Sequence, residues 1–243
     1  AGPLLERGIA VVTAAPANAV CVAEFVLGQV LLANKGYFRN TAACTSPDGW
    51  RTAFKGAGNF GQAVGILGAG FIGRTLMQLL QPFRLELLVW DPFAEPERIE
   101  QMGGTKIETL GELFARSNVL SNHLANVPET QGLITGELLA MLPADGVFIN
   151  TGRGATVVEP DLAQVFAQRA DLTALLDVTS PEPPEGDSPL YALPNVYLSS
   201  HIAGAINRER AGLADLMIEE FDRWRAGKAL RFAVTPAMLP TMA

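Results

Sequence analysis

Short apolar runs alternate with segments of helical spacing along most of the chain. The apolar runs, which predict strands, lie at 64–67, 85–90, 119–122, 146–150, 172–178 and 196–198. Segments that mix apolar and polar residues at helical spacing lie at 96–102, 110–116, 136–141, 159–170 and 207–225. Strands this short and apolar, separated by helices, are typical of a parallel sheet with helices on both faces. Right-handed crossovers then predict an α/β fold with a doubly wound parallel sheet.

The first part of the chain differs from this alternating pattern. A lone strand is predicted at 9–12, and residues 1–17 are interpreted as the tail of an earlier domain, because one strand forms no sheet of its own. Residues 18–36 are apolar on nearly every side, which predicts a buried connecting helix with Asn18 as its N-cap. Residues 36–62 are polar and Gly-rich and predict a linking loop. The domain assignment that follows is a nucleotide-binding domain over 37–206, then a final helix and tail over 207–243.

Composition narrows the class of protein. Of the 243 residues, 49% are apolar, which is ample for a buried core. The net charge of −7 argues against nucleic acid or an anionic membrane as a partner. The two cysteines, Cys21 and Cys44, lack C-x-x-C spacing, so neither a disulfide nor a metal site is expected. Neither an uninterrupted run of eighteen apolar residues nor a signal peptide is found, which predicts a cytoplasmic protein.

The first apolar run leads into a glycine-rich turn, Gly68-x-Gly70-x-x-Gly73, and then into a helical segment at 75–80. A strand, a glycine turn and a helix in this order form the pattern of a dinucleotide-binding unit. Gly68 allows a tight turn, Gly70 lets the backbone approach a pyrophosphate, and Gly73 lets the helix pack closely on the sheet. The N-terminus of the helix offers unpaired N–H groups and a partial positive charge to the phosphates.

An acidic residue follows the next predicted strand. Asp91 lies eighteen residues after Gly73, where a carboxylate can accept hydrogen bonds from the ribose hydroxyls of the cofactor. The same carboxylate repels a 2′-phosphate, so the predicted cofactor is NAD rather than NADP. Asp91 followed by proline is equally consistent with a simple turn after a strand, and the neighbouring glycine pattern is what favours the cofactor.

Side chains capable of chemistry follow three of the later strands. In doubly wound sheets, ligands bind beyond the carboxyl ends of the strands. Arg153 lies between two glycines after the run at 146–150, Glu182 lies among three prolines after the run at 172–178, and His201 follows the last strand. Taken singly, each has an ordinary interpretation: a surface arginine in a turn, a solvated loop carboxylate, and a histidine of the core or of a helix cap.

Taken together, the three side chains match the needs of hydride transfer to a carbonyl group. A nearby carboxylate favours the protonated form of a histidine, which can then donate a proton to the carbonyl oxygen as hydride reaches the carbon. An arginine binds a substrate carboxylate in a bidentate pair and polarises the carbonyl. Arg153, Glu182 and His201 are therefore the predicted catalytic residues.

Four motifs in this order resemble those of the D-isomer-specific 2-hydroxyacid dehydrogenases. They are the glycine turn at 68–73, Asn150-Thr151-Gly152-Arg153-Gly154, Leu176-Asp177-Val178-x-x-Pro181-Glu182-Pro183 and Leu193-Pro194-Asn195-Val196-x-Leu198-x-x-His201-Ile202-Ala203-Gly204. Their combination is highly specific, and the similarity covers essentially the whole chain. The resemblance implies a Rossmann-type NAD-binding domain with a remnant of a flavodoxin-like substrate domain. It also implies a homodimer that acts on a small 2-hydroxy acid or 2-oxo acid.

The resemblance further implies a role for individual residues. Arg153 would bind the substrate carboxylate and carbonyl, His201 would be the general acid for reduction and the base for oxidation, and Glu182 would pair with the imidazole. Asp177 would hold the nicotinamide carboxamide. The other cofactor-lining positions that the family pattern implies are Gly68, Gly70, Phe71, Ile72, Gly73, Asp91, His123, Leu124, Ala125, Thr130, Thr151, Gly152, Ser200 and Gly204.

The chain departs from the family pattern at several positions. His123-Leu124-Ala125 lacks the proline usual after the histidine, which implies a looser contact over the ribose. Thr179 replaces an aromatic residue, and Glu182 in place of glutamine argues against the formate dehydrogenase branch. Most of the substrate domain that precedes the connecting helix in the family is not in this sequence. Weak or absent activity is therefore expected of the chain by itself, because its site lacks one wall.

A second hypothesis keeps the fold and changes the function. The family includes transcriptional co-repressors that bind NAD(H) at the same site and use it to control assembly rather than for turnover. Tight NADH binding, without oxidation of NADH by any small 2-oxo acid, would favour such a sensor. The acidic composition and the lack of a partner-binding tail give this second hypothesis no positive support.

Overall fold

A computed structural model describes residues 1–241, and within them seven parallel strands form one sheet in the order β3-β2-β1-β4-β5-β6-β7. The strand order reverses between β1 and β4, so the predicted α/β doubly wound sheet is confirmed. The two-residue β3 was not predicted, because it is too short to give an apolar run. The strands are β1 (Ala63–Leu67), β2 (Glu86–Trp90), β3 (Thr105–Lys106), β4 (Val119–Asn122), β5 (Val147–Asn150), β6 (Thr173–Leu176) and β7 (Val196–Leu198).

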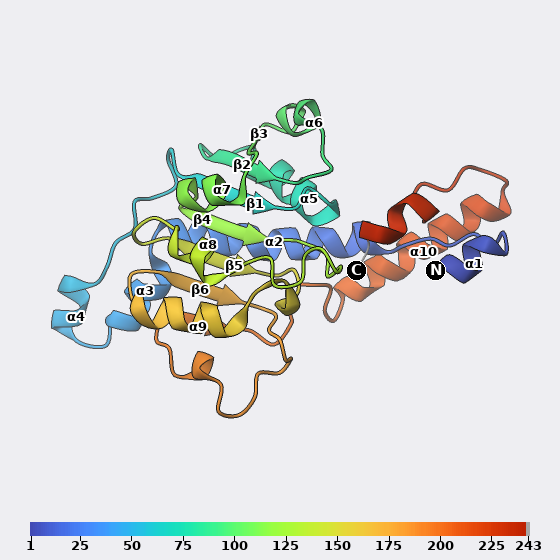
Figure 1. Ribbon diagram of the computed structural model, residues 1–243. Helices are drawn as coiled ribbons and strands as arrows, with labels where there is room; N and C mark the ends of the chain where they lie inside the picture. Colours follow the sequence, from blue (N-terminus) through green and yellow to red (C-terminus); the bar gives the residue numbers. More distant parts are fainter. Residues whose placement is uncertain (242–243) are drawn as a thin grey trace.

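Helices cover both faces of the sheet (Figure 1). The helices α2 and α5 pack on one face, and α7, α8 and α9 pack on the other. The helices are α1 (Gly2–Glu6), α2 (Ala15–Asn34), α3 (Tyr37–Ala43), α4 (Pro47–Thr52), α5 (Phe71–Leu80), α6 (Pro96–Gln101), α7 (Leu110–Arg116), α8 (Gly136–Ala140), α9 (Glu159–Gln168) and α10 (Glu209–Arg225). Three short 3-10 helices complete the description: η1 (Gly154–Thr156), η2 (Pro189–Tyr191) and η3 (Pro236–Thr241).

The central strands are buried on both faces, which is why they are continuous apolar runs. In β5, the side chains of Val147 and Ile149 join the core beneath α2 and α5. The side chain of Phe148, between them, joins the opposite core beneath α7, α8 and α9. This alternation follows from the two-residue period of a strand, and it leaves polar groups no place in the sheet except at its ends.

The connecting helix α2 begins three residues earlier than predicted. Asn18 lies inside its first turn and is not its N-cap; the Thr13 hydroxyl accepts a hydrogen bond from the Ala15 N–H instead. By length and composition, α2 is the one described helix that could cross a membrane, which the search for uninterrupted apolar runs did not anticipate. Its Val22 and Val26 are buried in the core that it shares with α5.

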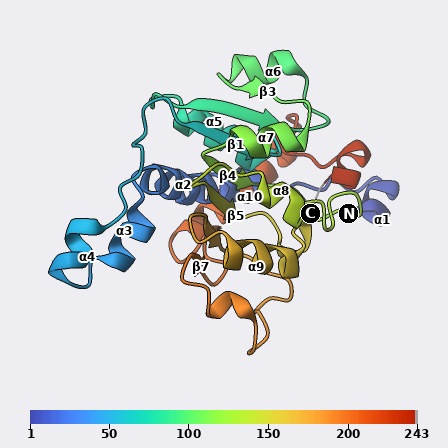
Figure 2. The same cartoon turned by 60° about the vertical axis from the view of Figure 1, so that its left-hand side comes forward.

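The prediction of a linking loop over 36–62 is wrong for residues 37–52, most of which form α3 and α4. The Ser46 hydroxyl caps α4 by accepting a hydrogen bond from the Gly49 N–H at 3.0 Å. Arg39 of α3 forms an ion pair with Asp145 and donates to the Asp171 carbonyl, just ahead of β5 and β6. These are long-range contacts that residue spacing does not reveal. The α3–α4 segment projects away from the sheet (Figure 2).

The two ends of the chain pair with each other. The strand predicted at 9–12 is reduced to a single antiparallel bridge between Val12 and Ala233, flanked by a hydrogen bond from the Val234 N–H to the Val11 carbonyl at 2.8 Å. Helix α1 precedes it, where no helix was predicted. The predicted strand thus has a pairing partner outside the main sheet, which comes from the other end of the sequence.

A buried carboxylate anchors the C-terminal tail to α10. Glu220 is completely buried and accepts hydrogen bonds from the Arg231 N–H, the Phe232 N–H and the Arg231 side chain. Burial by itself would raise the pKa of Glu220, but these hydrogen bonds lower it below its usual range. The tail is therefore held by a charge that remains ionised near neutral pH.

Replacing Phe148 by alanine should strongly destabilise the fold. The side chain is completely buried in β5, so its loss should lower the free energy of unfolding by about 3–5 kcal/mol. Replacing Phe93, which is 76% exposed, should change it by less than about 0.5 kcal/mol. Urea unfolding followed by circular dichroism measures both. Equal effects would contradict the placement of Phe148 in the core.

The stability of the fold should depend on the protonation of His123. Burial lowers the pKa of His123 to about 3 from its ordinary 6.5, so the unfolded chain binds this proton more readily than the folded protein. The stability contributed by neutral His123 is full above pH 6.5 and is lost as the pH falls towards 3. Between about pH 7 and about pH 5, the wild type should lose about 1–2 kcal/mol more than a His123→Asn variant.

Urea unfolding of the two proteins at both pH values tests this dependence. The comparison cancels every titrating group that the two proteins share. Asp171, for example, whose pKa is lowered to about 2 mainly by its hydrogen bond from Arg169, stays ionised throughout this window. Identical losses of stability in the two proteins would show that His123 is not held in its neutral form.

Candidate active site

The predicted catalytic residues lie on loops at one edge of the sheet. Asn150, Leu176 and Leu198 are register partners at the carboxyl ends of β5, β6 and β7. Arg153 follows the first of these strands by three residues, and His201 follows the last by three. Because neighbouring parallel strands end side by side, the sheet brings these loops to a common edge.

The glycine turn between β1 and α5 has the geometry that a dinucleotide site requires. Gly68 has a φ of +90°, which only glycine adopts without strain. A methyl group on Gly73 would lie 2.1 Å from the Gly68 carbonyl oxygen, so α5 can approach the turn only with glycine there. A methyl group on Gly70 would meet nothing, and the N-terminus of α5, at Phe71 and Ile72, has no side-chain cap. The turn therefore presents uncapped amides to open space, which fits a pyrophosphate.

Asp91 braces this turn from the end of β2. Its Oδ2 accepts a hydrogen bond from the Ala69 N–H at 2.7 Å, and its Oδ1 accepts from the N–H groups of Phe93 and Ala94. The carboxylate thus lies directly beside the glycine turn, where a bound adenosine ribose would come. Its predicted role as a ribose ligand stays a prediction.

The loop after β4 meets the glycine turn where the strand order reverses. A methyl group on Gly68 would lie 3.2 Å from the His123 carbonyl oxygen. The His123 ring contacts the Ser121 hydroxyl through Nε2 at 3.0 Å and the Thr151 hydroxyl through Nδ1 at 3.4 Å. Neither neighbour is a carboxylate, so nothing offsets the effect of burial that keeps this ring neutral.

The next turn of this loop is folded by Thr130. The Thr130 hydroxyl donates a hydrogen bond to the Ala125 carbonyl at 2.6 Å and accepts one from the Val127 N–H at 3.1 Å. Leu124 is 8% exposed and lies against the core. Leu124 and Ala125 therefore lie on a loop of fixed conformation. Thr130 stabilises this loop through hydrogen bonds to its backbone.

Arg153 stands on a tightly held segment after β5. Thr151 and Gly152 are buried, whereas Arg153 is exposed, with Nη1 donating to the Gly152 carbonyl at 2.7 Å. A methyl group on Gly154 would lie 2.0 Å from the Thr179 carbonyl, so the loops after β5 and β6 touch through their backbones. The exposed guanidinium is thus free to meet a substrate while its backbone is fixed.

His201 and Glu182 form the predicted pair. The Nδ1 atom of His201 lies 2.7 Å from Glu182 Oε1, and both side chains are about half exposed, at 49% and 42%. Glu182 lies between two cis prolyl bonds, Ser180-Pro181 and Glu182-Pro183. Because the carboxylate occupies Nδ1, the Nε2 atom is the one left to exchange a proton with a ligand.

Asp177 holds the loop that carries His201. Its carboxylate is 2% exposed and accepts hydrogen bonds from the Ser199 hydroxyl and from the N–H groups of Ile202 and Ala203. A carboxylate has about four acceptor positions, so about one remains for the nicotinamide carboxamide of the prediction. Asp177 also fixes the backbone of His201, whose N–H donates to the Asp177 carbonyl at 3.0 Å.

The remaining predicted positions lie on the same loop. Ser200 is exposed beside His201. Gly204 lies against α2: a methyl group on it would be 3.0 Å from Asn18 Oδ1, which accepts a hydrogen bond from the Ala205 N–H at 2.8 Å. Asn18 is thus a link between the connecting helix and the catalytic loop, a role different from the predicted N-cap.

Residue patterns missed several side chains that hold the site together. Asn122 and Thr156 form hydrogen bonds beneath the Arg153 loop, and Glu159 accepts one from the Ser180 N–H at 2.9 Å, which fixes the chain just before Glu182. The available signal was the pair of polar residues, Ser121 and Asn122, that ends the predicted strand at 119–122.

No group of histidine, cysteine, aspartate and glutamate side chains within the described part of the chain could hold a metal ion.

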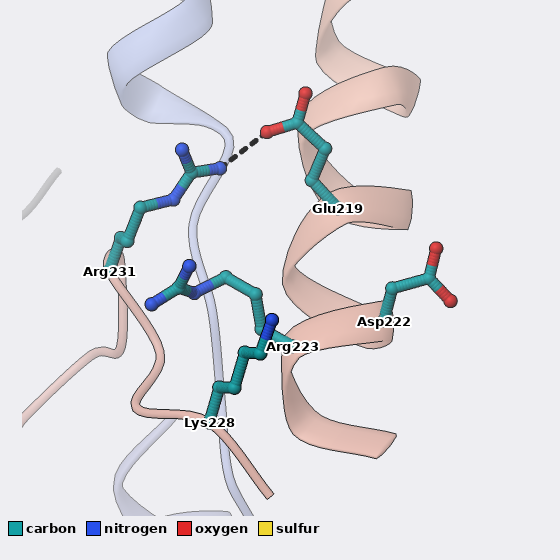
Figure 3. Close-up of a pocket in the computed structure, with 5 residues that line it drawn as sticks. All are labelled: Glu219, Asp222, Arg223, Lys228 and Arg231. Carbon is teal, nitrogen blue, oxygen red and sulfur yellow. Dashed lines mark hydrogen bonds and ion pairs between the residues drawn. The ribbon is translucent and has the colours of Figure 1, made fainter. Parts of the chain in front are cut away.

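A hollow beside α10 is lined by five charged residues and includes none of the predicted site residues (Figure 3). Its cations are largely paired already, as in the ion pair of Arg231 with Glu219. The hollow is therefore a network of ion pairs rather than a second binding site.

Comparison with known proteins identifies the family. Residues 27–203 match the profile of the D-isomer specific 2-hydroxyacid dehydrogenase, NAD binding domain. A D-3-phosphoglycerate dehydrogenase of Methanocaldococcus jannaschii is 27% identical over 235 residues, which are 97% of this chain and 45% of that protein. The chain therefore spans less than half the length of that relative.

Solved structures show the same fold. D-mandelate dehydrogenase of Rhodotorula graminis has a TM-score of 0.79 at 23% identity, covering 95% of this chain and 70% of that chain. A D-isomer specific 2-hydroxyacid dehydrogenase from Xanthobacter autotrophicus Py2, in complex with NADPH and MES, has a TM-score of 0.77 at 28% identity, covering 94% of this chain and 93% of that chain. With the glycine turn, the strand order and the matched profile in agreement, the chain belongs to the D-isomer specific 2-hydroxyacid dehydrogenases, and residues 27–203 match their NAD-binding domain.

Proposed function

We propose that the protein is an NAD-dependent oxidoreductase that transfers hydride between NAD(H) and a small D-2-hydroxy acid or its 2-oxo acid. The observation that carries the proposal is the 2.7 Å contact between His201 Nδ1 and Glu182 Oε1. It lies at the same edge of the sheet as Arg153 and the glycine turn. The family supports the cofactor and the class of substrate, since the relatives described above are dehydrogenases of phosphoglycerate and mandelate.

Each of the three side chains has a defined part in this reaction. Arg153 binds the substrate carboxylate, because the guanidinium fork matches two carboxylate oxygens. His201 gives a proton from Nε2 to the carbonyl oxygen in reduction and takes the hydroxyl proton in oxidation. Glu182 orients the ring through its contact with Nδ1. NAD(H), when bound along the glycine turn, supplies or accepts the hydride.

We also propose that the protein is a cytoplasmic homodimer. Family resemblance supports the dimer, as do the apolar side chains of Ile218, Phe221 and Trp224, which are 56–59% exposed along α10. The free state of Cys21 and Cys44 supports a reducing compartment.

Replacing His201 by alanine, in the protein as its gene encodes it, should abolish most turnover. The loss of the acid–base group should lower kcat with NADH and a 2-oxo acid by about 100- to 10,000-fold. The Kd for NADH, measured by fluorescence titration, should stay nearly unchanged because the glycine turn is untouched. Unchanged turnover would refute the assigned role.

The NAD(H)-sensor hypothesis replaces the dehydrogenase if the wild type binds NADH tightly but oxidises it with none of glyoxylate, pyruvate and hydroxypyruvate.

Replacing Arg153 by glutamine should weaken substrate binding. Loss of a bidentate, charge-assisted pair should lower kcat/KM for the 2-oxo acid by about 100-fold, mostly through KM. Arg153→Lys should recover only part of it, because an ammonium group lacks the planar fork. Arg51→Gln is the matched control, since Arg51 is 72% exposed and pairs only with Asp48 among the described ion pairs. An Arg153→Gln variant with wild-type KM would contradict the assignment.

A further inference from the structure

Asn122 is the last residue of β4, and its side chain is completely buried. Its Nδ2 donates to Asn150 Oδ1 at 2.9 Å and to Thr156 Oγ1 at 2.8 Å, and its Oδ1 accepts from the Leu124 N–H at 3.1 Å. None of the motifs in the sequence includes Asn122. Burying a side-chain amide costs free energy unless its N–H and C=O groups are hydrogen-bonded. All the groups of Asn122 are paired, and the partners show what the amide holds in place.

The two donated bonds lead to the two sides of the segment Gly152–Arg153. Asn150 Oδ1, which Asn122 holds, also accepts a hydrogen bond from the Gly152 N–H at 3.1 Å. Thr156 Oγ1, the second acceptor, donates to the Arg153 carbonyl at 2.7 Å. One side-chain amide therefore fixes both the backbone donor that precedes the Arg153 side chain and the backbone acceptor that follows it.

The segment Gly152–Arg153 is packed closely against Asn122 and Leu124, so a change in either neighbour displaces it. A methyl group on Gly152 would lie 3.2 Å from Asn122 Nδ2 and 3.1 Å from the Leu124 carbonyl. The Leu124 N–H is in turn held by Asn122 Oδ1, so the same amide also fixes the neighbouring cofactor-lining loop. In an interior this dense, a change in one member of the contact displaces the others.

We propose that Asn122 is a positioning residue for Arg153, which sets the place from which the guanidinium reaches the substrate carboxylate. The inference rests on the proposed function, in which Arg153 binds the substrate acid. Asn122 is buried and acts through Asn150 and Thr156, without touching the substrate. A misplacement of about 1 Å in such a group costs up to about 100-fold in rate, so loss of the amide should appear in substrate binding.

The chain offers a matched control in Asn195. This asparagine is 5% exposed, and its Nδ2 donates to the carbonyls of Phe166 and Leu172 at 3.0 and 2.9 Å. It lies just before β7, at the amino end of the sheet, opposite the edge that carries Arg153. Loss of either asparagine removes buried hydrogen bonds, but only the loss of Asn122 removes support for the Arg153 segment.

The test compares N122L, T156V, T156S and N195L in the protein as its gene encodes it. The ligands are NADH, the best 2-oxo acid of the panel, and oxalate as an analogue that does not react. T156V keeps the shape of Thr156 and removes the hydroxyl that joins Asn122 to the Arg153 carbonyl, and T156S restores it. N122L and T156V should raise KM for the 2-oxo acid and Kd for oxalate by about 10-fold or more, and T156S should stay within about 2-fold of the wild type.

Three further measurements separate positioning from stability. N195L should lower Tm without changing KM or the oxalate Kd. T156V should leave the Kd for NADH unchanged, since the Leu124 bond is intact in it. The double variant N122L/T156V should be no weaker in oxalate binding than N122L alone, because both changes break one chain of hydrogen bonds.

The outcomes separate this inference from the proposed function. An active wild type whose N122L and T156V variants keep wild-type KM overturns the role of Asn122 alone, as does an N195L variant with an equally raised KM. A wild type that binds oxalate without turnover refutes the proposed function alone, and the oxalate Kd values still decide the role of Asn122. A wild type that neither turns over a 2-oxo acid nor binds oxalate refutes the substrate role of Arg153, and the role of Asn122 with it.

Discussion

The buried carboxylate of Asp177 fixes the loop that carries His201, the proposed acid–base residue. His201 has a φ of 56°, a left-handed conformation that costs a residue other than glycine about 1–3 kcal/mol. Asp177 accepts three hydrogen bonds from the residues around His201, and hydrogen bonds to charged groups contribute about 1.5–3 kcal/mol each. They are therefore large enough to offset the strain. The pairing of His201 with Glu182 depends on a carboxylate that lies beneath the site rather than in it.

Each functional loop is held in this way by a buried or half-buried polar side chain. Asp177 holds the loop of His201, Asn122 supports the loop of Arg153, and Glu159 accepts a hydrogen bond from the chain ahead of Glu182. A sheet covered on both faces tolerates such side chains only where its strands end. The edge that binds ligands is thus also the one place where the fold can carry the groups that position them.

The parts of this arrangement that depend on local spacing could be predicted from the sequence, and those that depend on long-range contacts could not. The glycine turn is predictable because the φ of Gly68 and the close approach at Gly73 require glycine itself. The strands are predictable because burial on both faces makes them apolar. By contrast, α3 is held in place by the ion pair of Arg39 with Asp145, over a hundred residues away in the sequence. The hydrogen bond of Asn122 with Asn150 likewise joins the ends of two different strands. The role of a polar residue such as Asn122, which no motif includes, shows only when its partners are in place.

The two histidines of the chain lie in different surroundings, and this difference supports the acid–base role proposed for His201. His123 is enclosed between the Ser121 and Thr151 hydroxyls, and burial lowers its pKa to about 3, so it has no proton to give as a cation near neutral pH. His201 is half exposed, and its Nδ1 pairs with the Glu182 carboxylate, which leaves Nε2 open to a ligand. Both rings lie just beyond strands of the same sheet, and the exposed ring that is paired with a carboxylate is the one proposed to exchange a proton with the substrate.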